Sequence, residues 1–365
     1  MVIIGLVIFY RDLRLHDNRA LIRANAECDK IYCAFIVDAK TETANNPRKS
    51  RFLAESLYEL DGELRARGSQ LHYIREISLS TFISRIGAKK IYSHRPRAFL
   101  GPEDIIERDY YLFPDIRNSQ ARAYRKFTPF AEAAAKARAP KKSNSRINWS
   151  KFARYSREMR ASPPHVNVEN NYIRGGRTEG LRLLARPVGP RDILVENTTL
   201  LSPHNHFGTL SIREVWARYA REPDVRRQLL WRDFYGNMQD IEAVKCSWTT
   251  NNTRGLSAWT RAETGIAIVD AIMNQLNTTG WIHNRARLIA ATALVWVIGV
   301  DWRAGERYFA HSLVDYDPAQ NYYNWCWVAS ASSFANPPFR VLSVERQAKK
   351  YDYDNKYVAL WSPVK

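Results

Sequence analysis

The chain opens with the segment Val2–Asn18, VIIGLVIFYRDLRLHDN, which decides the fold of its first part. Residues 2–9 are an apolar run rich in β-branched side chains, with the length and composition of a buried strand. The residues that follow are polar, and Asp17 or Asn18 is suited to cap a helix. A buried strand, a polar loop and a helix in this order predict the first unit of a parallel sheet.

The same alternation continues along the first 130 residues. Further β-rich runs and amphipathic segments follow one another at 31–37, 50–67, 71–74, 79–86 and 90–92. This pattern predicts an α/β domain over residues 1–130, with a parallel sheet wound with helices. No G-x-G-x-x-G follows the first strand, so the dinucleotide fingerprint is absent.

Length and charge narrow the function classes. The chain has 365 residues, enough for two domains, and 55 basic against 37 acidic side chains give a net charge of +18. This excess favours polyanionic partners. With 45% hydrophobic and 25% charged residues, the composition is that of a globular protein and excludes general disorder.

Cysteine usage and the apolar segments bear on the compartment. Four cysteines at irregular spacing form neither a disulfide framework nor a C-x2-C zinc site, which favours a reducing compartment. The chain start lacks a basic leader and a cleavage site, and the longest apolar run, Leu288–Val300, is too short to span a bilayer. We expect a cytoplasmic or nuclear protein without a secretory signal, a membrane partner or a bound metal, and a monomer.

The middle of the chain is strongly basic. Between Lys136 and Arg191 there are 14 Lys or Arg and three Glu, and the helical period is lost. Pro163-Pro164 and Gly175-Gly176 are typical of a connection between domains. We predict a basic interdomain linker at 131–172; a surface that faces phosphates is the functional alternative.

The remaining residues, 173–365, predict an all-α domain. Residues 265–276 place apolar side chains on one stripe, with Gly280 as a stop, and Ala290–Val300 is apolar on all sides. Ten of the eleven tryptophans lie between Trp216 and Trp361. This uneven distribution of tryptophan predicts that the two halves of the chain have different functions.

Two blocks of the second half carry polar groups at positions where they could bind a ligand. Residues 197–203 hold three hydroxyls before a helix, which could bind phosphate, although such residues usually act as helix caps. Gln228, Trp231 and Arg232 share one helical face at spacings of three and four. The alternative for this face is a core tryptophan with a surface arginine.

A third block joins cations to possible anionic partners. Arg285 and Arg287 lie at the start of the most hydrophobic helix, and they need an anionic partner if they are buried. Asp315 and Asp317 are the candidates, in a segment that ends with Trp325-Cys326-Trp327.

Together these blocks resemble the photolyase/cryptochrome flavoprotein family, and the resemblance extends over nearly the whole chain. Its opening motif is similar to 12–18, its flavin-phosphate loop to 198–202, its H-N-R-x-R motif to 283–287, and its flavin-pocket core to 301–307 and 315–327. The resemblance implies an α/β amino-terminal domain, an all-α FAD-binding domain, and UV-damaged DNA as the partner.

The resemblance also implies which residues hold FAD. Arg287 and Asp315 would pair beside the flavin ring. Asn321 would face the ring nitrogen whose protonation separates the radical from the anion states of the flavin. An Asn there is the residue of repair enzymes. The full set of implied cofactor residues is Thr198, Thr199, Leu200, Leu201, Ser202, Arg232, Arg287, Asp315, Asp317 and Asn321.

Photoreduction in this family passes along three tryptophans. Their matches are Trp325, Trp302 and Trp248, the last of which requires one inserted residue in 249–257. Three core tryptophans without a redox role are the alternative.

For DNA, the family turns a pyrimidine dimer out of the duplex into a cavity. Trp231 and Trp327 match the stacking walls. Asn284 and Gln228 would bond the base edges, while Arg285 and Gln347 match positions that contact the strand.

One departure bears on the substrate. Gln228 stands where enzymes that repair cyclobutane dimers usually carry Glu, and Gln is typical of enzymes acting on the 6-4 photoproduct. Those enzymes, however, need two histidines as acid–base groups, at positions that are Asn284 and Leu288 here. Neither side chain can transfer a proton at neutral pH.

We therefore expect a lyase that splits cyclobutane pyrimidine dimers by electron transfer from photoexcited reduced FAD. A cryptochrome-like blue-light photoreceptor and a 6-4 photolyase are the alternatives, and a structural DNA-binding flavoprotein is a third. Whether a folate or deazaflavin antenna binds the first domain stays open. The chain ends at Lys365, where relatives continue for another helix or two.

Overall fold

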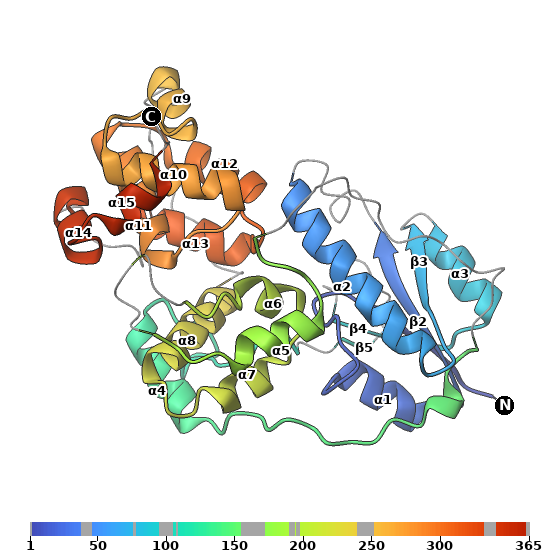
Figure 1. Cartoon of the computed structure of the whole chain (residues 1–365). Helices are drawn as coiled ribbons and strands as arrows, with labels where there is room; N and C mark the ends of the chain where they lie inside the picture. Colours follow the sequence, from blue (N-terminus) through green and yellow to red (C-terminus); the bar gives the residue numbers. More distant parts are fainter. Residues whose placement is uncertain are drawn as a thin grey trace. The chain divides into compact units, whose positions relative to one another are not determined.

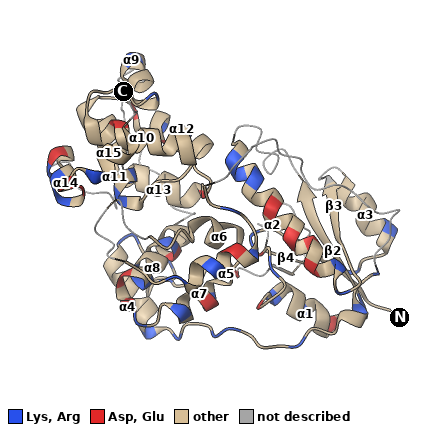
Figure 2. Cartoon of the chain, viewed as in Figure 1, with Lys and Arg blue, Asp and Glu red and all other residues tan. Residues whose placement is uncertain are grey.

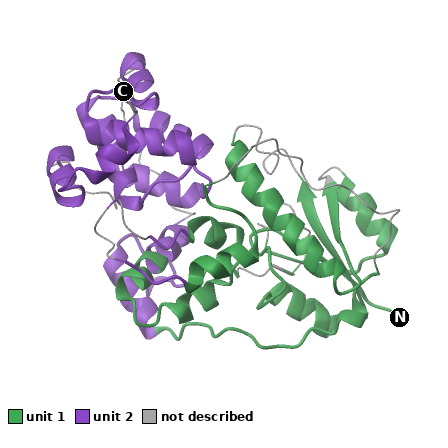
Figure 3. Ribbon diagram, viewed as in Figure 1, with its two compact units in different colours: residues 1–114, 137–185, 201–229 green, residues 115–136, 186–200, 230–365 purple. Residues whose placement is uncertain are grey.

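The structure is a computed structural model that describes residues 2–37, 46–75, 78–94, 105–106, 109–154, 172–189, 194, 198–238, 252–331 and 341–362. Contacts divide the chain into two compact units (Figure 3). Unit 1 comprises 1–114, 137–185 and 201–229, and unit 2 comprises 115–136, 186–200 and 230–365. These units group residues by contact, whereas the expected boundaries at 130 and 172 are functional and remain a prediction.

Unit 1 contains the predicted parallel sheet. Its strands are β1 (Ile4–Phe9), β2 (Lys30–Val37), β3 (Leu71–Arg75), β4 (Lys90–Ser93) and β5 (Ile105–Ile106). They pair in parallel in the order β3-β2-β1-β4-β5 (Figure 1), the order of a doubly wound fold. Four of the five strands coincide with the predicted apolar runs, because parallel strands covered on both faces are apolar throughout.

The helices of unit 1 begin where the sequence offers caps. Asn18 caps α1 (Arg19–Glu27) by accepting a hydrogen bond from the amide of Leu21 at 3.1 Å. The others are α2 (Pro47–Arg65), α3 (Leu79–Ile86), α5 (Arg177–Ala185), α6 (Ser202–Phe207) and α7 (Ile212–Arg218). The division between the units falls inside α8 (Pro223–Asn237).

A buried ion cluster fixes the polar loop after β1. Asp109 accepts hydrogen bonds from Arg14 at 2.9 Å and from the Arg213 guanidinium, which also binds Asp17 at 2.8 Å. All four side chains are at most 1% exposed. Burial alone would raise the pKa of Asp109, but Arg213 and Arg14 outweigh it and hold the pKa below its usual value. These ion pairs thus hold the loop after β1 against α7.

Unit 2 is helical, as predicted. Besides most of α8 it contains α4 (Phe127–Lys136), α9 (Thr253–Thr260), α10 (Ala267–Thr279), α11 (Asn284–Thr292), α12 (Trp302–Ser312), α13 (Pro318–Val328), α14 (Val344–Tyr351) and α15 (Lys356–Trp361). Gly280 ends α10 with a left-handed φ of 70°, as expected for a stop. Among the described helices, none combines the length and the apolarity that crossing a bilayer requires.

One predicted element differs in detail. The segment 290–300 is expected to be a helix buried on all sides, but its side chains are buried without interruption only from Ala290 to Val295, and Val300 is buried again. After Thr292 the helix widens into a π turn over Ala293–Val297, and Val297 is 59% exposed. The wider turn changes the rotation per residue, so Val297 points away from the core.

We predict that Asp109→Asn lowers the free energy of unfolding by about 3–5 kcal/mol, because it leaves the buried guanidinium of Arg14 without its anion and removes one of the two carboxylates that Arg213 binds. The native stabilisation by this carboxylate is present above its ordinary pKa and is lost as the pH falls through its lowered native pKa. The variant should therefore lose less stability on acidification. Urea unfolding at several pH values measures both effects. Glu179→Gln, which removes an exposed pair with Arg182, is the control and should change stability little; equal effects of the two substitutions would contradict the role of the cluster.

Candidate functional site

Of the predicted flavin residues, Leu201 and Ser202 belong to unit 1, and the others belong to unit 2. Asp317 is the N-cap of α13 and accepts hydrogen bonds from the amides of Ala319 at 3.0 Å and Gln320 at 3.2 Å. Pro318 takes the first helical position, where its missing N–H costs nothing. This cap fixes the start of α13 and so places Asn321 and Trp325, four residues apart, on one face.

Arg287 and Asp315 form the predicted ion pair. Arg287 Nη2 lies 2.8 Å from Asp315 Oδ2, and the Arg287 Nε donates to the carbonyl of Ile282 at 3.1 Å. The Asp315 side chain is 3% exposed, whereas that of Arg287 is 25% exposed. Asp315 Oδ1 is buried and accepts no hydrogen bond from the described residues. A buried carboxylate oxygen in this state can accept a hydrogen bond from a bound group or from water.

Asn321 is oriented by a residue that the sequence analysis did not single out. Its Nδ2 donates to Oε1 of Glu306 at 2.9 Å and to the Glu306 carbonyl at 3.0 Å. The amide nitrogen is thus committed, which leaves the carbonyl oxygen to accept a bond from a ligand. Burial raises the pKa of Glu306, against the opposing effect of the Asn321 bond. Only its place inside the block 301–307 could have indicated this role.

Two of the three predicted electron-transfer tryptophans are described. Trp325 and Trp302 are each 2% exposed and belong to one apolar core. Trp325 packs directly on α12 at Gly305, where a Cβ would lie 2.2 Å from its ring carbon Cη2. The glycine therefore permits the close approach of this ring to α12. Trp248 lies outside the described residues.

Trp231, the predicted stacking wall, is itself stacked within unit 2. Its ring lies parallel to that of Phe127 from α4, with centroids 3.7 Å apart and 4° between the planes. Phe234 and Tyr235 contact the same indole at 5.6 Å each. Trp231 and Trp327 are both half-buried, so each indole retains accessible surface. Phe127 thus covers one face of Trp231 and fixes its plane.

The residues expected to meet DNA include exposed side chains. Asn284 is exposed at the first position of α11, which the His283 side chain caps by accepting from the amide of Arg285 at 3.1 Å. The guanidinium of Arg285 lies 4.6 Å from the ring centroid of Tyr351 and 3.4 Å from Oε1 of Gln347. Gln228 is exposed on α8.

The hydroxyl loop does not act as a conventional cap. The residue at the N-cap of α6 is Leu201, which has no polar side chain, and Leu200 adopts a left-handed φ of 53°. The N-cap position of α6 is thus held by an apolar residue and not by one of the hydroxyl side chains of 198–202. Arg232 is half-buried, and its carbonyl accepts a hydrogen bond from Gln320 of α13 at 2.7 Å.

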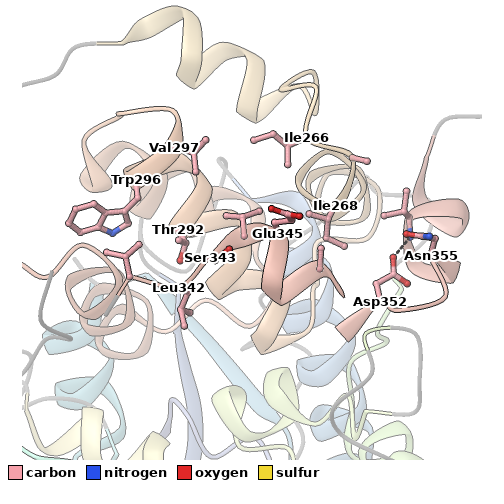
Figure 4. Close-up of a pocket in the computed structure, with 15 residues that line it drawn as sticks. Ile266, Ile268, Thr292, Trp296, Val297, Leu342, Ser343, Glu345, Asp352 and Asn355 are labelled. Carbon is pink, nitrogen blue, oxygen red and sulfur yellow. Dashed lines mark hydrogen bonds between the residues drawn. The ribbon is translucent and has the colours of Figure 1, made fainter. Parts of the chain in front are cut away.

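A separate groove in unit 2 has a different character (Figure 4). It measures about 570 Å³ and is lined chiefly by apolar side chains, among them Ile266, Trp296, Leu342 and Val344. Its described lining contains no Lys or Arg and no predicted site residue. Such a groove is unsuited to a dinucleotide with two phosphates. Within the described ranges, no cluster of His, Cys, Asp and Glu could hold a metal ion.

Comparison with known proteins agrees with this geometry. Residues 225–364 match the family model for the FAD binding domain of DNA photolyase, and residues 5–97 match the model for DNA photolyase. The deoxyribodipyrimidine photo-lyase of Streptomyces griseus is 31% identical, over 99% of this chain and 89% of the relative.

Solved structures of the same kind are similar over the full length. The archaeal photolyase from Sulfolobus tokodaii, crystallised with two FAD molecules, has a TM-score of 0.86 and 33% identity, over 99% of this chain and 90% of that one. A Synechocystis cryptochrome has a TM-score of 0.82 and 25% identity, over 100% of this chain and 89% of that one.

We predict that Asp315→Asn lowers the affinity for FAD about tenfold or more, because a charge-assisted acceptor is replaced by a neutral one that offers an N–H to Arg287. Fluorescence titration of flavin-depleted protein with FAD measures the change. Asp301→Asn is the matched control, since Asp301 caps α12 and Asn caps equally well. Unchanged affinity in the Asp315 variant would contradict the assignment.

Proposed function

The chain belongs to the DNA photolyase family, and we propose that it is a light-driven lyase that splits cyclobutane pyrimidine dimers in DNA. The observation that carries the proposal is the set of Arg287, Asp315, Glu306 and Asn321, in which the buried Asp315 and Asn321 offer a carboxylate oxygen and an amide oxygen in the unit that also contains two buried tryptophans. The functional division into a domain at 1–130, a linker at 131–172 and a helical domain at 173–365 is part of the proposal.

The residues present fit FAD. The unmatched Asp315 Oδ1 calls for an N–H donor of the kind that a flavin ring carries. We assign Asp315, Arg287, Asp317 and Asn321 to the flavin ring, and Arg232 and the loop 198–202 to the rest of the cofactor. Bound FAD, once reduced and excited, supplies the electron that opens the dimer. Asn321 contributes a neutral amide, which cannot supply an acidic proton.

The lesion would be held by stacking and by hydrogen bonds. Trp231 and Trp327 offer flat apolar surfaces, and stacking of a base on an aromatic ring is worth about 1–3 kcal/mol. Asn284 and Gln228 carry amides that both donate and accept, as base edges require. Arg285 and Gln347, held near each other on α11 and α14, would contact the strand.

Non-specific affinity would come from the positive surface. The net charge is +18, and Lys and Arg side chains occur on both units, for example Lys349 and Lys350 on α14 (Figure 2). Binding through such side chains weakens steeply as salt is added. We further propose that the protein acts as a monomer in the cytoplasm or a nucleus. We also propose that it binds an antenna cofactor in addition to FAD.

A cryptochrome-like photoreceptor is the second candidate, favoured by the similarity to the Synechocystis cryptochrome. Repair of 6-4 photoproducts is disfavoured, because Asn284 and Leu288 occupy consecutive turns of α11 where two histidines would be needed.

We predict that chemically reduced protein restores thymines in an oligonucleotide bearing a cyclobutane dimer under blue light and not in the dark. The restored thymines are counted by chromatography. Recovery that is equal in light and darkness, or absent in both, would remove the lyase assignment. Recovery of a 6-4 substrate instead would establish the alternative lesion.

We predict that Phe127→Leu weakens binding of the dimer-bearing oligonucleotide about 2- to 10-fold, since loss of a stacked partner costs about 0.5–1.5 kcal/mol and frees the Trp231 plane. Affinity for undamaged DNA should stay unchanged in a fluorescence anisotropy titration. Phe82→Leu, in unit 1, is the control. An equal loss for damaged and undamaged DNA would show that Phe127 acts on the general DNA surface instead.

A further inference from the structure

Trp302 has surroundings that destabilise a positive charge on its ring. The guanidinium of Arg303 lies 5.0 Å from the indole centroid, and Asp301 offsets its charge only in part, at 3.1 Å. The Trp302 Nε1 hydrogen is buried and is donated to no described residue. An oxidised Trp302 would therefore keep its proton and remain a cation next to another cation.

Tyr322 is the described aromatic side chain in contact with Trp302. Its ring centroid lies 5.5 Å away at an interplanar angle of 67°. Tyr322 is half-buried and its hydroxyl forms a hydrogen bond with the Cys326 side chain, whereas Trp302 is 2% exposed. A phenol at such a place can lose an electron and a proton together and end as a neutral radical.

The other groups around Tyr322 keep its phenol protonated in the dark. Burial raises its pKa, and the Cys326 thiol one turn later and the Glu306 carboxyl act in the same direction, while Arg303 opposes them. Neutral Tyr322 thus has its proton to release only once it is oxidised.

We propose that Tyr322 is a redox-active side chain that reduces oxidised Trp302 during photoreduction. The inference rests on the proposed function, in which light-driven reduction of oxidised flavin through Trp325 leaves the electron vacancy on Trp302. One electron passes from the Tyr322 ring to the Trp302 radical cation, which returns to neutral tryptophan. The O–H bond of Tyr322 breaks, its proton goes to water, and a neutral tyrosyl radical remains.

Because Tyr322 contacts Trp302, electron transfer from Tyr322 is a branch of the tryptophan chain. A tyrosyl radical that has given its proton to water recombines more slowly than a radical cation that has kept it. Tyr322 would therefore prolong charge separation independently of Trp248. Tyr323, the next residue, is the matched control, since it is buried and donates its hydroxyl hydrogen to the carbonyl of Met238.

The test is electron paramagnetic resonance of oxidised, FAD-loaded protein that is illuminated without external reductant and frozen. We expect a tyrosyl signal in the parent and in Tyr323→Phe, and its loss in Tyr322→Phe at equal flavin content. In Trp248→Phe the tyrosyl signal should persist. A tyrosyl signal that survives in Tyr322→Phe, or a parent with tryptophan radicals alone, would overturn the inference.

Parent protein with ring-deuterated tyrosine gives a measurement that needs no variant, because a tyrosyl spectrum narrows on deuteration and a tryptophan spectrum does not. An unchanged spectrum would also overturn the inference. Failure of the proposed function is distinguished by chemically reduced parent protein, which needs no photoreduction: if it splits dimers under light while no tyrosyl radical forms, only the role of Tyr322 is wrong.

Discussion

The ion pair between Arg287 and Asp315 is the interaction on which the helical unit depends. Taking two charges out of water costs several kcal/mol for each ion, by order of magnitude, unless each finds partners. Among the described residues, Arg287 is the partner of Asp315 Oδ2, and Oδ1 has no partner. In the function we propose, the flavin supplies the donor for that second oxygen.

The apolar core of unit 2 contains the side chains to which we assign the redox role, so the same tryptophans pack the core and would transfer electrons. Trp325 reaches α12 because Gly305 has no side chain, and Trp302 lies under Arg303 at the start of the same helix. Both indoles belong to one apolar core. In unit 1, by contrast, the buried cluster of Arg14, Asp17, Asp109 and Arg213 satisfies its charges internally and needs no ligand. We therefore assign a structural role to the cluster of unit 1 and a binding role to the Arg287–Asp315 pair.

Much of the fold follows from local sequence signals. The apolar runs located four strands of the sheet, Asn18 and Gly280 marked helix ends, and the helical unit was predicted. The family resemblance implied a pair of Arg287 and Asp315 beside a flavin; the structure has their 2.8 Å contact, and its place at a flavin stays a prediction. Glu306 and Phe127 were missed because their roles arise from contacts with α13 and α8, between residues 15 and 104 positions apart, which no local pattern encodes. The π turn after Thr292 was missed because apolar periodicity does not distinguish it from an α-helix.

The most direct test of this account is a crystal structure of the protein with FAD. We predict electron density for a flavin ring in unit 2, with a ring N–H about 3 Å from Asp315 Oδ1 and the Asn321 amide oxygen in contact with the ring. Density for the flavin in the apolar groove beside Trp296, or at a place where Asp315 Oδ1 stays without a donor, would contradict it.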